Sequence, residues 1–83
     1  DNMKECNFLE TLSTTKICMK IIGNNIKRLR TENDLSQFDL ACLCECDKSV
    51  ISELERGVYQ NITIKTLIKF SYIFEVDIVN LIH

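Results

Sequence analysis

Three cysteines alternate along one short stretch, Cys42, Cys44 and Cys46, and closely spaced thiols can bind zinc or copper(I) or respond to oxidation. At the end of a helix, however, alternate residues point to different faces, so one metal centre would require that helix to unwind. The only histidine, His83, ends the sequence, and no second cysteine cluster accompanies the first. We therefore expect Cys44 and Cys46 to pack in a core, Cys42 to be exposed, and no metal or other cofactor to be needed.

Residue patterns for catalysis are otherwise missing from the sequence. It offers no paired-carboxylate cleft, no cysteine–histidine or serine–histidine arrangement, and no glycine-rich phosphate loop. A single terminal histidine is a poor base for organised catalysis. We expect that the chain is not an enzyme.

The cysteines belong to residues 35–57, which are typical of two short helices joined by a tight turn. Ser36 can cap the first helix and Asp47 the second. The apolar residues of the two helices are Phe38, Leu40, Ala41 and Cys44, then Val50, Ile51 and Leu54. Only Glu45 to Asp47 remain between them, and so short a connection forces a sharp crossing. This is the geometry of a helix-turn-helix, which many proteins use to place a helix in the major groove of DNA.

A longer helix is expected before this stretch. Its apolar face consists of Ile22, Ile26 and Leu29. Thr14 or Thr15 can cap it, and Asn33 supplies turn chemistry at its end. Gly23 lies inside it at a cost of about 1 kcal/mol relative to alanine, so we expect close packing against a helix from the C-terminal half.

Two more helices are expected after this stretch. Gly57 can stop the second motif helix in a left-handed conformation. Thr63 can cap a fourth helix, and Asp77 a short fifth. These two helices carry more apolar residues than one face can bury, which usually marks an interface.

Composition limits the possible folds and cellular locations. At 83 residues, with 46% hydrophobic residues, no Pro and two Gly, the chain is expected to form one all-α body. No apolar run approaches the roughly 20 residues of a membrane span, and the N-terminus lacks the pattern of a signal peptide, so we expect a cytoplasmic protein without membrane contact. The net charge of −2 means that any surface for nucleic acid requires charges sorted by face.

A set of residues in register from Ile22 to Ile82 supports a more specific interpretation. It comprises Ile22, Gly23, Ile26, Lys27, Leu29, Arg30, Leu35, Ser36, Gln37, Leu40, Ala41, Ser49, Ile51, Ser52, Leu54, Glu55, Arg56, Gly57, Thr63, Leu67, Phe74, Val76 and Leu81. Together these residues resemble the phage-repressor type of helix-turn-helix, the Cro-like and XRE-type regulators. The resemblance implies a compact five-helix, lambda-repressor-like domain for DNA binding and dimerisation at residues 16–83, and a short N-terminal extension at residues 1–15.

The resemblance also assigns roles. Base edges would be contacted by Lys48, Ser49, Ser52 and Glu53, and phosphates by Gln37, Arg28, Arg56, Tyr59 and Asn61. Arg30 and Glu55 would form a structural ion pair between the first helix and the recognition helix. Lys48 can bind guanine O6 and N7, whereas Ser49 and Ser52 fit a solvated helix surface equally well.

Two residues depart from the family pattern. Glu53 occupies a position where a cation or amide is common, so it either accepts a hydrogen bond from a cytosine amine or pairs with Lys48 or Arg56. Glu45 stands where the family usually has glycine in the turn. If the backbone there has positive φ, Glu45 is strained.

In this family the C-terminal helices commonly form a two-fold dimer. The resemblance therefore implies a homodimer through Ile68, Tyr72, Val79 and Ile82. Its two recognition helices would lie about one DNA turn apart, roughly 34 Å, on a pseudo-palindromic operator.

The function implied is a transcriptional regulator on double-stranded DNA, either a restriction-modification controller protein or a small repressor. One alternative is an antitoxin or protein-interaction module whose partner binds the N-terminal segment. Another is a regulator that senses redox state through its cysteines. The sequence does not specify the operator, the regulated gene, the direction of regulation or an effector.

Overall fold

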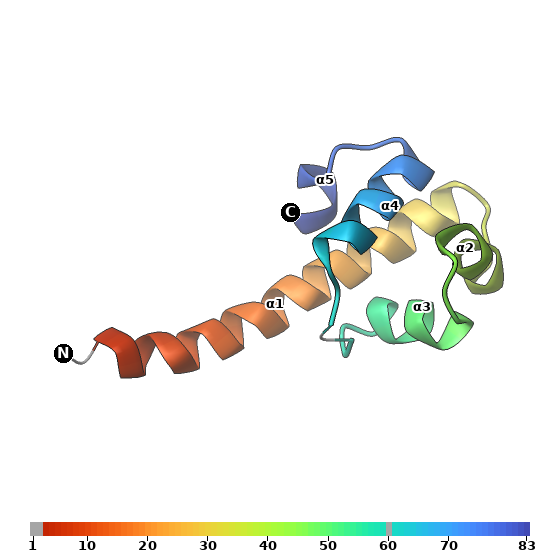
Figure 1. The fold of residues 1–83 in the computed structure, drawn as a ribbon. Helices are drawn as coiled ribbons and strands as arrows, with labels where there is room; N and C mark the ends of the chain where they lie inside the picture. The colour runs from red at the N-terminus through yellow and green to blue at the C-terminus, as the bar shows by residue number, and fades with distance from the viewer. Residues whose placement is uncertain (1–2, 60) are drawn as a thin grey trace.

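The computed structural model describes the backbone of residues 3–59 and 61–83 and the side chains of residues 15–59 and 61–83. In this part of the chain the architecture is all-α, as the sequence predicts. Five helices follow one another, and Figure 1 shows the last four gathered against the second half of the first. They are α1 (Met3–Glu32), α2 (Gln37–Cys44), α3 (Lys48–Glu55), α4 (Ile64–Phe74) and α5 (Val79–Ile82).

Helix α1 begins earlier than expected. A start at Thr14 or Thr15 was wrong, because α1 runs without a break for 30 residues from Met3 to Glu32. Its first half projects away from the other helices in Figure 1. The physical reason is that residues 3–22 contain neither Pro nor Gly to interrupt the helix, and an isolated Thr lowers helix propensity only slightly.

The core lies where the second half of α1 meets the other four helices. Its buried residues are Met19, Ile22, Ile26, Leu29, Leu40, Ala41, Cys44, Ile51, Leu54, Phe70, Phe74 and Leu81. Phe70 and Phe74 of α4 stack with their ring centroids 6.2 Å apart. Every helix contributes at least one buried residue, so the five helices share a single core. Phe38 is an exception to the expected apolar pattern, because it is exposed on α2.

Side-chain caps fix the beginnings of α2 and α4. Ser36 Oγ accepts a hydrogen bond from the Asp39 backbone N–H at 2.9 Å, and Asp39 Oδ2 accepts one from the Ser36 N–H at 3.0 Å. This reciprocal pair is a capping box. Thr63 Oγ1 accepts from the backbone N–H of Thr66, as expected of an N-cap. Both caps satisfy backbone donors that have no partner inside the helix.

The other two expected caps differ. Asp47 occupies the N-cap position of α3 but makes no capping hydrogen bond through its side chain. Asp77 does not cap α5, because the N-cap is Ile78. Asp77 contributes its backbone carbonyl instead, which accepts from the Asn80 N–H at 2.9 Å. The prediction of an Asp77 cap was therefore wrong.

The turn between α2 and α3 has the expected length and conformation. Glu45 follows Cys44 with φ 59° and ψ 46°, the left-handed conformation predicted to strain a non-glycine residue. The Cys46 N–H donates to the Ala41 carbonyl at 3.0 Å, which closes the C-terminal end of α2. In Figure 1 α2 is seen almost end-on while α3 runs across the view, so the two helices cross sharply.

None of the helices in the described residues combines the length and the apolar character that a membrane crossing requires.

Candidate nucleic-acid interface

One side of helix α3 is apolar and buried, and the other side, which we call its polar edge, is exposed. Its inward residues, Ile51 and Leu54, are completely buried. On the other side, Lys48 and Ser49 are exposed, and the two remaining predicted base-contact residues, Ser52 and Glu53, are partly exposed. All four predicted base-contact residues therefore lie on the accessible side of one helix.

A backbone contact with α1 sets the position of α3. A Cβ atom at Gly23 would collide with the carbonyl oxygen of Leu54 and would lie 3.1 Å from the Leu54 carbonyl carbon. The expected reason for a glycine inside α1 is therefore correct, and the neighbouring helix is α3 itself. Because no side chain separates them, α1 supports α3 along its backbone.

An ion pair reinforces the same contact. Arg30 Nε lies 2.6 Å from Glu55 Oε2, and Arg30 Nη2 lies 3.1 Å from Glu55 Oε1. The side chains are only 13% and 4% exposed, and the hydrogen bond to Glu55 raises the pKa of Arg30. A third guanidinium nitrogen, Nη1, donates to the Leu35 carbonyl at 2.8 Å. Arg30 thus connects α1, the loop before α2, and the last residue of α3.

The N-terminus of α2 lies beside this ion pair. Gln37, predicted to contact a phosphate, donates from Nε2 to Glu55 Oε1 at 3.1 Å and is partly buried. Its amide group carries a second N–H, which this hydrogen bond leaves available. At the same helix end, the Ser36 backbone N–H lowers the pKa of Asp39, the capping carboxylate.

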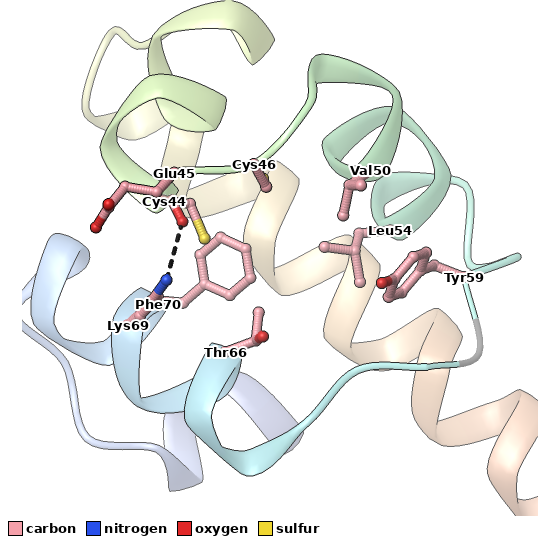
Figure 2. A pocket seen from close by; sticks show the side chains of 9 residues that line it. All are labelled: Cys44, Glu45, Cys46, Val50, Leu54, Tyr59, Thr66, Lys69 and Phe70. Atoms are coloured by element: carbon pink, nitrogen blue, oxygen red, sulfur yellow. Dashed lines mark hydrogen bonds between the residues drawn. The ribbon is translucent and has the colours of Figure 1, made fainter.

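The predicted phosphate contacts in the segment after α3 differ in their exposure. Arg56 and Asn61 are exposed. Tyr59 instead packs against the core and borders a hollow between α3 and α4, where Figure 2 shows its ring. Gly57 has the expected positive φ, 75°, and its Cα faces the side chain of Lys20 on α1.

Lys20 is a further cation beside the end of α3, outside the predicted phosphate contacts. It is exposed and borders the same surface depression as Asn24, Arg56 and Gly57. The sequence indicates this position only weakly. Lys20 lies three residues before Gly23, so the two residues are close together on the surface of the helix. Only the contact between Gly23 and α3 shows which side of α1 faces the recognition helix.

Arg28 lies on a different side of α1. Asn25, one turn earlier, donates from Nδ2 to the Leu81 carbonyl in α5 at 2.9 Å, whereas Gly23 and Arg30 contact α3. Because residues three apart share a helix side, Arg28 belongs to the side nearer α5. It forms an exposed ion pair with Glu32 at 3.2 Å. Arg28 is thus separated from the other predicted DNA contacts.

The charges near α3 are mixed. Lys48 stands at the start of α3, and Lys20 and Arg56 lie near its end. Within the described residues, Glu53 forms no ion pair with Lys48 or Arg56, so pairing within the protein does not explain this carboxylate. Its main-chain carbonyl accepts from the Val58 N–H at 3.1 Å and the Tyr59 N–H at 3.3 Å.

The cysteines divide as the sequence predicts. Cys44 is buried and Cys46 packs against the core, whereas Cys42 is exposed. Burial raises the pKa of Cys44 to about 11, and the neighbouring Cys46 acts in the same direction. In the part of the chain that the structure describes, no three His, Cys, Asp or Glu side chains come together as a metal site.

Large apolar side chains are exposed on both α4 and α5. They are Ile64, Ile68, Tyr72, Val79 and Ile82, and we call this set the α4–α5 patch. Tyr72 is 84% exposed and Ile64 is 72% exposed. The four residues predicted to form a dimer interface all belong to this patch.

Comparison with known proteins gives one family match. Residues 26–81 match the model of a family described as helix-turn-helix, which covers more than half of the chain. A search of curated proteins found no match.

Solved structures with similar folds include three bacterial proteins. A hypothetical transcription factor from Neisseria superposes with a TM-score of 0.73 at 24% identity, covering 80% of this chain and 75% of that one. The restriction-modification controller protein C.AhdI from Aeromonas hydrophila gives 0.69 at 28% identity, covering 76% of this chain and 94% of that one. An HTH_3 family transcriptional regulator from Vibrio cholerae gives 0.72 at 28% identity, covering 81% of this chain but only 37% of that one.

Proposed function

This chain belongs to the helix-turn-helix family of XRE-type DNA-binding regulators, and we propose that it binds a short palindromic operator as a homodimer and regulates transcription from it. The observation that carries this proposal is the orientation of α3. Ile51 and Leu54 are wholly buried while Lys48 and Ser49 are exposed on the opposite side. A helix anchored in this way can enter a major groove with its N-terminal residues against the base edges.

Base recognition is assigned to the polar edge of α3. Lys48, at the helix start, carries donors that suit guanine O6 and N7. Ser49 and Ser52 can donate to or accept from either base of a pair. Glu53, which lacks an ion-pair partner among the described residues, suits the N4 amine of cytosine.

Phosphate contacts are assigned to groups near the C-terminal end of α3 and to Asn61, which is exposed in the following segment. Gln37 lies at the N-terminus of α2, where backbone N–H groups and the helix dipole favour an anion, and it donates to Glu55 at the end of α3. Arg56 and Lys20 border one depression together with Glu55. We leave Arg28 and Tyr59 out of this set, because Arg28 lies on the side of α1 nearer α5 and Tyr59 packs inward. This clustering accommodates the acidic net charge, since binding requires only a local cationic surface.

The α4–α5 patch supports the homodimer. Tyr72 and Val79, at 84% and 48% exposure, would lose contact with water if a second copy covered them. A two-fold axis through this patch would present two α3 helices to successive major grooves, with half-sites roughly 34 Å apart. The chain's similarity to C.AhdI over nearly all of that protein supports a controller protein, and a small repressor is the close alternative.

A protein-binding role is the second candidate, and the projection of α1 favours it. The first half of this helix leaves the body of the domain in Figure 1, and Ile17, where side chains are described, is 59% exposed. An isolated helix of that length is marginally stable in water, so a protein partner would stabilise it. A toxin neutralised by this segment would be such a partner.

Selection of bound sequences from random duplex DNA tests the proposal. We expect enrichment of an inverted repeat whose half-sites are one helical turn apart. Absence of enrichment, with the protein shown to be folded by circular dichroism, would contradict the operator-binding role and favour the protein-binding candidate.

A further inference from the structure

A hollow of about 180 Å³ lies between the α2–α3 turn, α3 and α4. Much of its wall is apolar, because Val50 and Leu54 of α3 and Phe70 of α4 border it (Figure 2). Two side chains with polar ends, Lys69 of α4 and Tyr59 of the segment after α3, border it as well. None of the residues to which we assign DNA contacts lines this hollow.

The two polar ends have unused hydrogen-bond donors. Lys69 Nζ donates to the Cys44 carbonyl at 3.4 Å, a long hydrogen bond, and it forms no ion pair with any described residue. An ammonium group has three donors, so others stay available. The Tyr59 hydroxyl has no hydrogen-bond partner among the described residues. Both groups can therefore donate to a ligand in the hollow.

The size of the hollow and the places of its polar groups limit the ligand. In Figure 2, Lys69 and Tyr59 lie on opposite sides of the Phe70 ring, so a ligand that contacts both needs polar groups at two ends of an apolar body. An engineered apolar cavity of about 150 Å³ binds benzene, so this hollow can hold one six-membered ring with small substituents. It is partly open to solvent, which lets a ligand enter the folded chain.

We propose that this hollow binds a small aromatic carboxylate with a hydroxyl group at the opposite end of its ring, a molecule of the para-hydroxybenzoate type. The carboxylate accepts a charge-assisted hydrogen bond from the Lys69 ammonium. The hydroxyl of the ligand pairs with the hydroxyl of Tyr59. The ring packs against Leu54 and Phe70, where contact between two aromatic rings adds to the effect of burial.

Charge selects an anion over other ligands of this size. A cation would be repelled by the Lys69 ammonium, and a purely apolar ligand would cover polar groups without replacing their hydrogen bonds to water. Glu45 also borders the hollow, and its negative charge opposes an anion. Figure 2 shows the Glu45 carboxylate directed away from Phe70 and Tyr59. Glu45 and Lys69, both described, form no ion pair, so no salt bridge neutralises the ammonium.

Occupation of the hollow would connect α3 to α4 through Leu54 and Phe70, which both belong to the core. A ligand that binds only the folded chain raises its melting temperature. Binding requires the fold and no DNA, so this site holds or fails independently of the proposed operator binding.

Titration of the full-length, nitrogen-15-labelled chain with para-hydroxybenzoate under reducing conditions tests the site. Two-dimensional NMR should show saturable shifts of the backbone amide signals of Cys46, Leu54 and Phe70, which surround the hollow. The amide of Arg28, on the side of α1 nearer α5, should not shift. Shifts confined to Lys20 and Arg56 would place the anion in the depression near the end of α3 and overturn the proposal.

Variants at the two polar ends separate their roles. Lys69→Met removes the ammonium but keeps an unbranched chain, and it should weaken binding of para-hydroxybenzoate roughly tenfold. Lys65→Met, one turn earlier on α4 and exposed, is the matched control and should bind as the wild type does. Tyr59→Phe should weaken binding of para-hydroxybenzoate and leave that of benzoate unchanged.

An uncharged analogue keeps the test decisive if Lys69→Met fails to fold. Para-hydroxybenzyl alcohol has the same ring and hydroxyl without the carboxylate, so the wild-type chain should bind it roughly tenfold more weakly than the acid. Equal affinity for the acid and the alcohol would overturn the proposal. So would the absence of saturable shifts in the wild type, or equal weakening in Lys65→Met and Lys69→Met.

Discussion

Gly23 of α1 lies directly against the backbone carbonyl of Leu54 in α3, with no room for a Cβ atom between them. The residue that follows Leu54, Glu55, is held by Arg30 from the same helix α1. The outward presentation of α3 therefore depends on α1, through one backbone contact and one ion pair. Both interactions can be altered without touching the polar edge proposed to read DNA.

Replacing Gly23 with Ala should destabilise the chain by about 1–3 kcal/mol, because the added methyl group has to displace backbone atoms of α3. For a domain of this size, each kcal/mol corresponds to roughly 4–8 °C in melting temperature. Asn24→Ala, at the exposed neighbouring position, is the matched control and should leave stability unchanged or slightly higher. Thermal unfolding followed by circular dichroism measures both. Equal melting temperatures for Gly23→Ala and the wild type would show that α1 and α3 are not in backbone contact.

Arg30→Ala should cost about 3–5 kcal/mol, because it leaves the Glu55 carboxylate, 4% exposed, without its cation. Arg28→Ala removes an arginine from the same helix whose ion pair with Glu32 is more than half exposed, and it should change stability by less than about 1 kcal/mol. Urea unfolding of the two variants gives the comparison. Similar losses in both would indicate that burial does not distinguish the two ion pairs.

Glu45→Gly should raise stability, by about 1 kcal/mol or a few degrees, since only glycine adopts positive φ without steric cost. Glu75 has almost the same left-handed conformation after α4, so Glu75→Gly should act in the same direction. Glu32→Gly, in a right-handed helical position, should act in the opposite direction. A lower melting temperature for Glu45→Gly would contradict the strain assigned to the turn.

Tyr72→Glu combined with Val79→Glu should convert a dimer into a monomer, because each carboxylate would be buried against the second copy. Light scattering should then give the monomer mass of 9.6 kDa, while the wild type gives twice that value. Leu43→Glu changes an exposed apolar residue on α2, outside the α4–α5 patch, and should remain dimeric. An unchanged mass for the double variant would place the dimer interface elsewhere.

The helix-turn-helix could be predicted because its signals are local. Ser36 and Thr63 cap by hydrogen bonds within three residues, and the turn at Glu45 follows from the few residues between two apolar patterns. The start of α1 and the role of Asp77 were missed for the opposite reason. Thr14 and Thr15 permit a helix start without requiring one, and an aspartate before a short helix can contribute its main-chain carbonyl in place of its side chain.

The sequence predicts which residue types form the candidate site better than it predicts where each residue lies in the fold. The polar edge of α3 follows from helical periodicity once Ile51 and Leu54 are assigned to the core. Which side of α1 faces α3 depends on tertiary packing, so helical periodicity alone does not show that Lys20 lies beside Arg56 while Arg28 lies on another side. The inward position of Tyr59 also depends on packing between α3 and α4, which periodicity within one segment does not encode.

The most direct test of the central claim compares Lys48→Ala with Arg56→Ala on the DNA sequence obtained by selection and on its single base-pair variants. We predict that Lys48→Ala loses about 1–3 kcal/mol of discrimination at particular base pairs. Arg56→Ala should weaken binding to all sequences alike and reduce the slope of log affinity against log salt concentration by about 1. If the two variants weaken binding identically at every base pair, the polar edge of α3 does not read DNA sequence.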